Sequence, residues 1–128
     1  MSILVVDRDP HVRELAAHFL NQAGYSVEFA TDGPSALERA RALHPDVVIT
    51  EILLPKVDGL ALCRELKRDP ATRSIAVLVF SILAAEGHAR EAGADAFLMK
   101  PLGERRFLAA VEEILAARAR AATGEKGA

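Results

Sequence analysis

Residues 46–59 decide the fold, and they read Asp46-Val-Val-Ile-Thr-Glu51-Ile-Leu-Leu-Pro55-Lys-Val-Asp58-Gly59. The first part, Val47–Thr50, is a short run of β-branched residues with no polar alternation, which is typical of a parallel strand that is covered on both faces. The last part, Asp58-Gly59, is suited to begin a helix, because an aspartate caps helix N-termini well. The stretch therefore predicts a buried strand, a loop and a helix, with the ionisable Glu51 directly after the strand.

The same alternation extends over the rest of the chain. Similar apolar runs occur at Ile3–Val6, Val27–Ala30, Ile75–Phe80 and Ala96–Met99. Stretches with helical periodicity lie between or after them, at Pro10–Ala23, Pro34–Leu43, Leu60–Arg68, Ala84–Ala92 and Glu104–Ala119. Five strand–helix units in one small chain predict an α/β protein with a doubly wound, flavodoxin-like architecture of three layers, and a five-stranded parallel sheet in the order 2-1-3-4-5.

Composition and charge exclude several classes of function. The chain has 128 residues and a formal net charge of −2, so we expect one domain over residues 1–120, no nucleic-acid binding and a flexible tail over residues 121–128. Arg118, Arg120 and Lys126 are interpreted as a solvated helix end. Cys63 is the single cysteine, which we expect to be buried and inert. With no signal peptide and no membrane span, a cytoplasmic location is expected.

Polar residues follow four of the five predicted strands. In an open parallel sheet, ligands bind at the carboxyl ends of the strands, near the point where the strand order reverses. At that edge we expect three carboxylates, two cations and a hydroxyl to converge; the residues in these positions are Asp7, Arg8, Asp9, Glu51, Ser81 and Lys100, the last followed by Pro101.

Four segments together resemble the response-regulator receiver domains of the CheY-like superfamily. They are Ile3-Leu-Val-Val-Asp7-Arg-Asp9-Pro10, Pro45–Gly59, Glu91-Ala-Gly93-Ala-Asp95 and Lys100-Pro101. The resemblance covers roughly residues 2–118. It implies a signalling protein of a two-component phosphorelay, whose receiver takes a phosphoryl group from a histidine kinase.

The resemblance also implies a role for each position at the sheet edge. An acidic pair after the first strand would hold Mg²⁺, and Asp7, Arg8 and Asp9 lie there. An aspartate after the third strand would be phosphorylated, but this chain has Glu51. A hydroxyl and a lysine would hold the phosphoryl oxygens, and an aromatic residue on the fifth strand would swing inward; these positions carry Ser81, Lys100 and Phe97.

Two of these positions depart from the implied chemistry. Arg8 cannot ligate Mg²⁺ and repels it, so we expect no cofactor, with Asp7 and Glu51 as weak metal candidates only. Glu51 is one methylene longer than aspartate, which displaces an incoming phosphoryl group from Ser81 and Lys100. We expect Arg8 to replace the metal cation and Glu51 to stay ionised between Arg8 and Lys100; the alternative is that Arg8 faces solvent and the site has decayed. A further hypothesis is that Glu51 partly mimics a phosphorylated aspartate.

A third departure concerns the segment between Ser81 and Lys100, which looks about one helical turn shorter than in the family. There the resemblance implies the partner face, formed by the fourth helix, fifth strand and fifth helix. Ile82 replaces a small residue and is expected to crowd the site. Phe97 is either a remnant of the switch or a strand residue half-buried against the fourth helix.

The interpretation that we favour is a stand-alone receiver-like domain that is not an enzyme. It would act by protein–protein interaction with a kinase, an output partner or a second copy, without aspartyl phosphorylation. The alternative is a working phospho-acceptor that uses a non-standard carboxylate, for which Asp7 and Asp9 are the nearby aspartates. A flavin-phosphate site is disfavoured because the acidic loop after the first strand repels phosphate. A cobalamin site is disfavoured because Glu14 stands where the motif of that family has glycine. His11 and His18 are interpreted as surface residues.

Overall fold

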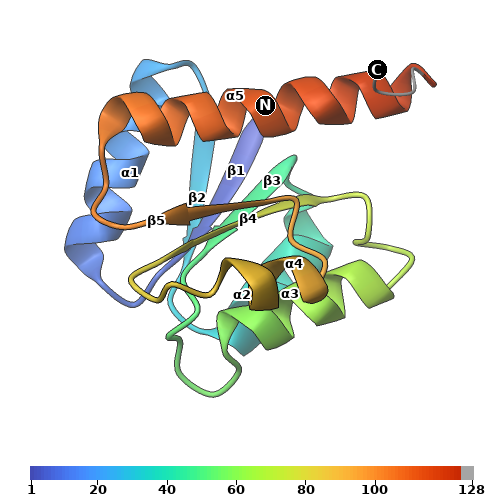
Figure 1. Ribbon diagram of the computed structural model, residues 1–128, viewed down its shortest axis with the longest axis horizontal. Helices are drawn as coiled ribbons and strands as arrows, with labels where there is room; N and C mark the ends of the chain where they lie inside the picture. Colours follow the sequence, from blue (N-terminus) through green and yellow to red (C-terminus); the bar gives the residue numbers. More distant parts are fainter. Residues whose placement is uncertain (125–128) are drawn as a thin grey trace.

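The computed structural model describes residues 1–124 and contains one five-stranded parallel sheet (Figure 1). The strands are β1 (Ser2–Val6), β2 (Ser26–Ala30), β3 (Val47–Thr50), β4 (Ala76–Ser81) and β5 (Ala96–Met99). The helices are α1 (Pro10–Gln22), α2 (Gly33–Leu43), α3 (Gly59–Arg68), α4 (Glu86–Glu91) and α5 (Glu104–Ala122). The strand order is β2-β1-β3-β4-β5 with every pair parallel, which confirms the predicted fold class.

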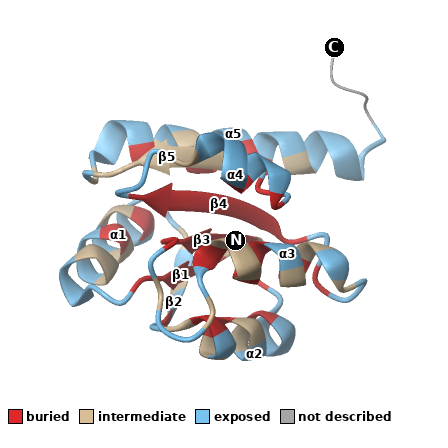
Figure 2. Ribbon diagram, turned by 60° about the horizontal axis from the view of Figure 1, so that its bottom comes forward, coloured by how far each residue is buried: buried red, intermediate tan, exposed pale blue. Residues whose placement is uncertain are grey.

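Two hydrophobic cores cover the two faces of the sheet. Figure 1 shows α1 and α5 on one side and α2, α3 and α4 on the other. Alternate strand residues divide between the cores: Leu4 and Val79 pack toward α2, α3 and α4, whereas Ile3 and Leu78 pack toward α1 and α5. Every residue of β4, an inner strand of the sheet, is buried (Figure 2). The three inner strands β1, β3 and β4 therefore read as continuous apolar runs, because both of their faces are covered, whereas the edge strand β2 is largely exposed.

Aspartates cap the start of three helices, α1, α2 and α3, and the cap at Asp58 was predicted from the sequence. Asp9 Oδ1 accepts a hydrogen bond of 2.9 Å from the His11 amide at the start of α1. Asp58 Oδ1 accepts one of 2.8 Å from the Ala61 amide at the start of α3. The next residue, Gly59, lies so close to the loop after β3 that an added Cβ would be 2.1 Å from the Glu51 carbonyl oxygen. The start of α3 is thus packed directly on the backbone of residue 51.

Helix boundaries and one face differ from the prediction. Helix α4 begins at Glu86 rather than Ala84 and has only six residues, without a side-chain cap at its start. Helix α5 continues to Ala122, so residues 121 and 122 of the predicted tail are helical, while residues 125–128 lie outside the described residues. Leu15, placed on the buried face of α1 by its spacing, is 42% exposed.

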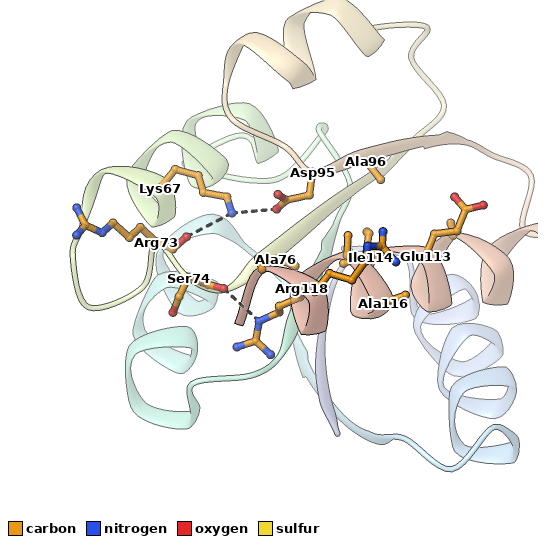
Figure 3. Close-up of a pocket in the computed structure, with 14 residues that line it drawn as sticks. Lys67, Arg73, Ser74, Ala76, Asp95, Ala96, Glu113, Ile114, Ala116 and Arg118 are labelled. Carbon is orange, nitrogen blue, oxygen red and sulfur yellow. Dashed lines mark hydrogen bonds and ion pairs between the residues drawn. The ribbon is translucent and has the colours of Figure 1, made fainter. Parts of the chain in front are cut away.

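The prediction that the basic residues near the end of α5 form a solvated helix end is wrong for Arg118. Arg118 is not simply solvated, because its Nη1 donates to Asp46 Oδ1 at 2.7 Å. Its Nε donates to the Ser74 carbonyl at 3.2 Å, a contact drawn in Figure 3. Asp46 also accepts the Ser2 amide at 2.8 Å. Arg118 therefore ties the last turns of α5 to the amino edge of the sheet. Lys126, the third member of the predicted cluster, lies outside the described residues.

Cys63 is completely buried on α3. Burial raises the pKa of its thiol to about 11, which disfavours the thiolate form at neutral pH, and the predicted burial of this residue is confirmed. None of the helices within residues 1–124 combines the length and the apolar character needed to cross a membrane.

Candidate functional site

Four polar side chains predicted for the site meet at the carboxyl edge of the sheet. Asp7 follows β1, Glu51 follows β3, Ser81 ends β4 and Lys100 follows β5. Because these strands are neighbours in the order β1-β3-β4-β5 and all run parallel, their carboxyl ends place the four residues side by side. All except Lys100 are buried, and the Lys100 side chain is only 12% exposed.

Lys100 stands between the two carboxylates. Its Nζ donates to Asp7 Oδ2 at 2.9 Å and lies 2.9 Å from Glu51 Oε2. The ammonium also lies 5.7 Å from the centroid of the Phe80 ring, within reach of a cation–π attraction. Burial acts to lower the pKa of Lys100, but the hydrogen bonds and charges of Asp7 and Glu51 outweigh it, so the net shift is upward. Lys100 is therefore firmly protonated.

Glu51 is held at both carboxylate oxygens. Oε1 accepts the Ile52 amide at 2.7 Å, the Leu53 amide at 3.3 Å and the Ser81 hydroxyl, while Oε2 faces Lys100. Burial acts to raise the pKa of Glu51. The hydrogen bonds from Ser81, Lys100 and the Ile52 amide outweigh this effect and hold the pKa below its ordinary value. Glu51 is thus an ionised, fully satisfied group inside the protein.

Ser81 connects Glu51 to the loop between β4 and α4. Its hydroxyl donates to Glu51 and accepts the Leu83 amide at 3.1 Å. Since Glu51 also accepts amides of its own loop, one carboxylate organises the loops after β3 and β4 together. These loops expose large apolar side chains: Leu53 is 40% exposed, Ile82 59% and Leu83 38%.

The expected pair between Arg8 and Glu51 is wrong. Arg8 is exposed, and within residues 1–124 its guanidinium has no ion-pair or hydrogen-bond partner, so the alternative that it faces solvent holds. Both residues follow the end of β1: Asp7 turns inward to Lys100, and the chain bends at Arg8, whose side chain is exposed. A different arginine contacts residue 7: the Nη1 of Arg13 donates a hydrogen bond to the Asp7 carbonyl oxygen at 2.6 Å.

The carboxylates do not fit Mg²⁺, which requires several oxygen ligands in near-octahedral geometry. Asp7 Oδ1 already accepts the Asp9 amide at 2.9 Å, and its Oδ2 faces Lys100. Both oxygens of Glu51 are engaged, and Asp9 is turned away to cap α1. No step that depends on a bound metal ion is therefore derived for this site.

Two further predicted contributors lie at the margin. Phe97 is partly buried and packs against the core that contains Ala89 and Ala92, as expected for a strand residue covered by the helix–loop region of α4. Ile82 does not crowd the carboxylates, because its side chain faces outward. It borders an open groove of about 560 Å³ lined by His11, Val12, Leu15, Ile82, Lys100, Pro101 and Leu102. His11 and His18 are exposed, as predicted.

A second hollow, of about 620 Å³, lies at the opposite edge of the sheet (Figure 3). Two of its charged groups pair with each other, Lys67 with Asp95 at 2.9 Å, and Arg118 donates to the Ser74 carbonyl and to Asp46 outside the hollow. The hollow is far from Glu51 in the fold, because it lies at the amino ends of β4 and β5. It contributes nothing to the candidate site.

Sequence reasoning missed three contributors to the site. Phe80 supplies the aromatic floor beneath Lys100, Arg13 binds the Asp7 carbonyl, and Gly59 allows α3 to approach Glu51. For Phe80, its place next to Ser81 on a buried strand was the available signal. For Gly59, the Asp-Gly pair was recognised only as a helix start.

Comparison with known proteins gives a consistent result. Residues 3–112 match the family model described as response regulator receiver domain. The DNA-binding dual master transcriptional regulator RpaA of Synechocystis sp. is 37% identical over 88% of this chain and 48% of its own length. Response regulator MprA of Mycobacterium leprae is 39% identical over 90% of this chain and 51% of its own length. The chain thus spans about half the length of these curated relatives.

Solved structures extend the similarity to the whole fold. A putative response regulator from Chloroflexus aurantiacus superposes with a TM-score of 0.86 at 34% identity, over 90% of this chain and 97% of the other. The signal receiver domain of a signal transduction histidine kinase from Syntrophus aciditrophicus gives 0.84 at 34% identity, over 91% and 90%.

Proposed function

The chain belongs to the response regulator receiver domain family, and from this premise we propose that it signals through protein–protein contacts without accepting a phosphoryl group. The observation that carries the proposal is the engagement of Glu51. Ser81 and Lys100, the two groups that the family resemblance assigns to the phosphoryl oxygens, already bind the carboxylate of residue 51. The chain's own side chain therefore fills the place meant for the transferred group.

The chemistry of phosphoryl transfer also argues against acceptance. The transfer depends on positioning and on electrostatic stabilisation, and a displacement of about 1 Å costs on the order of 100-fold in rate. Glu51 has no free oxygen directed at an incoming phosphorus atom, because both oxygens accept short contacts from protein donors. The nearby aspartates offer no substitute: Asp7 is paired with Lys100 and Asp9 caps α1.

We propose that Glu51 sets one conformational state permanently. Its single negative charge reproduces part of the charge of a phosphoryl group, which carries nearly two at neutral pH. The hydrogen bonds from Ser81 to Glu51 and from Leu83 to Ser81 would then hold the loop after β4 as a phosphorylated site would. In this proposal the signalling output is constitutive, and it changes only with the amount of partner protein that is present.

The proposed partner face consists of α4, β5 and α5. All four residues of β5 are partly exposed, and Phe97 of this strand packs against the core that contains Ala89 of α4. The face would bind a kinase, an output partner or a second copy of the chain. Nucleic acid is not proposed as a ligand, since the formal net charge of −2 provides no basic surface.

The proposal is tested by intact-mass measurement after incubation with Mg²⁺ and a small acyl phosphate. The proteins compared are wild type, Glu51→Asp, and Glu51→Asp combined with Arg8→Asp. We expect a phosphoryl adduct on the double variant and none on wild type, because the two changes restore the acidic pair and the shorter nucleophile. An adduct on wild type contradicts the proposal, and the modified residue would then identify the non-standard carboxylate.

A further inference from the structure

The carboxyl edge of the sheet contains its own cation. The ammonium of Lys100 lies 2.9 Å from an oxygen of Asp7 and 2.9 Å from an oxygen of Glu51. The side chains of the two acids are 4% and 5% exposed, so water does little to separate the three charges. The two buried carboxylates share one cation, and that cation is a side chain of the protein itself.

The other carboxylate oxygens complete the same arrangement. Asp7 Oδ1 accepts the Asp9 amide, and Glu51 Oε1 accepts the Ser81 hydroxyl and the Ile52 amide. Each acid thus gives one oxygen to the shared ammonium and one to neutral donors. A divalent ion could bind between the acids only after Lys100 left and these hydrogen bonds rearranged.

We propose that Lys100 is the permanent cation of this site and that it excludes divalent metal ions from Asp7 and Glu51. The inference rests on the proposed function, since a receiver that accepts no phosphoryl group has no need of an exchangeable metal. Charge arithmetic supports it: the three groups sum to −1, and adding a divalent ion without removing Lys100 would bring +1. Arg8, which follows Asp7 in the chain and is exposed, adds a positive charge that repels a divalent ion.

A consequence is that the site becomes a metal site when the charge of Lys100 is removed. In Lys100→Met, two buried carboxylates would carry −2 without a partner, a charge that one divalent ion balances. We expect the variant to melt on the order of 10 °C below wild type in metal-free buffer, because it leaves buried charges unpaired. Added Mg²⁺ or Mn²⁺ should restore part of this loss by binding the folded state.

The test combines melting temperatures with Mn²⁺ titration followed by electron paramagnetic resonance. NaCl at matched ionic strength separates specific binding from charge screening. Lys67→Met is the matched control, because Lys67 also pairs with an aspartate, Asp95 at 2.9 Å, but has no second acid beside it. We expect divalent ions to raise the melting temperature of Lys100→Met only, and Mn²⁺ to remain free in the presence of wild type.

The inference is overturned if wild type binds Mn²⁺ saturably, or if Lys100→Met gains no more from Mg²⁺ than from NaCl. The wild-type titration decides the matter even if Lys100→Met does not fold. Failure here is distinct from failure of the proposed function. Metal binding by wild type without a phosphoryl adduct refutes the resident cation alone, whereas an adduct on wild type refutes the proposed function.

Discussion

At the scale of single residues, the site is governed by the length of one side chain. The extra methylene of glutamate brings the carboxylate of Glu51 within hydrogen-bonding distance of the Ser81 hydroxyl and Lys100 at once. Buried charges are tolerated when they are paired and hydrogen-bonded, and each atom of this carboxylate meets that condition. Glu51 is therefore a buried structural ion, and we expect its removal to lower the stability of the fold.

The first prediction concerns Glu51→Gln. The pKa of Glu51 in the folded protein lies below its ordinary value of 4.5, so the charged form stabilises the fold above that value. This contribution is lost as the pH falls through the lower, folded-state pKa. At pH 7 we expect the substitution to reduce the free energy of unfolding by about 2 kcal/mol. The difference between the two proteins should shrink in acid.

Urea unfolding of both proteins between neutral pH and pH 3 measures this difference. Glu112→Gln serves as the control, because Glu112 is exposed on α5 and has no ion pair within the described residues. A difference that stays constant, or grows, as the pH falls contradicts an ionised Glu51 that stabilises the fold.

At the scale of elements, two loops are tied to one carboxylate, and a helix start is packed against its backbone. The loop after β3 donates its Ile52 amide to Glu51, and the loop after β4 is linked through Ser81. Gly59 brings α3 within contact distance of the Glu51 carbonyl. Movement of any of these three segments would therefore displace the Glu51 carboxylate. The carboxylate is thus coupled to the exposed side chains of Leu53 and Leu83 in the two loops.

The second prediction concerns Gly59→Ala. An added Cβ would be 2.1 Å from the Glu51 carbonyl oxygen and 2.9 Å from the Ile52 Cα, and backbone atoms cannot yield as a flexible side chain can. We expect a loss of about 3 kcal/mol in the free energy of unfolding, since α3 must move away from the loop. Urea unfolding at neutral pH measures the loss.

Gly87→Ala provides the matched control within α4. No atom lies within 4 Å of a Cβ at that position, and alanine is the better helix former, so we expect stability to be unchanged or raised by about 0.5–1 kcal/mol. Equal effects of the two substitutions would contradict the close approach at Gly59.

Element positions could be predicted from sequence because local patterns determine them. The five predicted strand segments became strands, and Asp58 became a cap, since both signals depend on neighbours in the chain. Helix ends were less predictable: α5 continues to Ala122 because its alanines favour helix and Arg118 anchors it to Asp46, a contact between residues far apart in sequence.

The candidate site was predictable in part. The rule for parallel sheets placed Asp7, Glu51, Ser81 and Lys100 together, and the structure brings all four into contact. The pairing of Glu51 with Lys100 was also predicted, whereas Arg8 and Asp9 were expected at the site but do not reach it, because Arg8 faces solvent and Asp9 caps α1. Sequence gives the order of residues along the strand ends, whereas side-chain direction requires the backbone.

At the scale of the whole molecule, the protein keeps the receiver fold around two carboxylates that already share a cation, Lys100. Both hydrophobic cores are present and the inner strand β4 is fully buried, so the fold is not a decayed remnant. In Figure 2 the buried sheet lies between helices whose outer faces are exposed. These outer faces are the surface that partners could contact. The account therefore predicts a molecule that presents one state regardless of phosphodonor or Mg²⁺.

The most direct measurement is the amide ¹H–¹⁵N spectrum of wild type before and after addition of Mg²⁺ and an acyl phosphate. We expect the signals of Leu53, Leu83 and Phe97 to stay in place, because the loops and strand that they report on are already set by Glu51. In Glu51→Asp with Arg8→Asp, the same signals should move. Movement in wild type that follows the lifetime of the phosphodonor would contradict the account, since it would show a receiver that still switches.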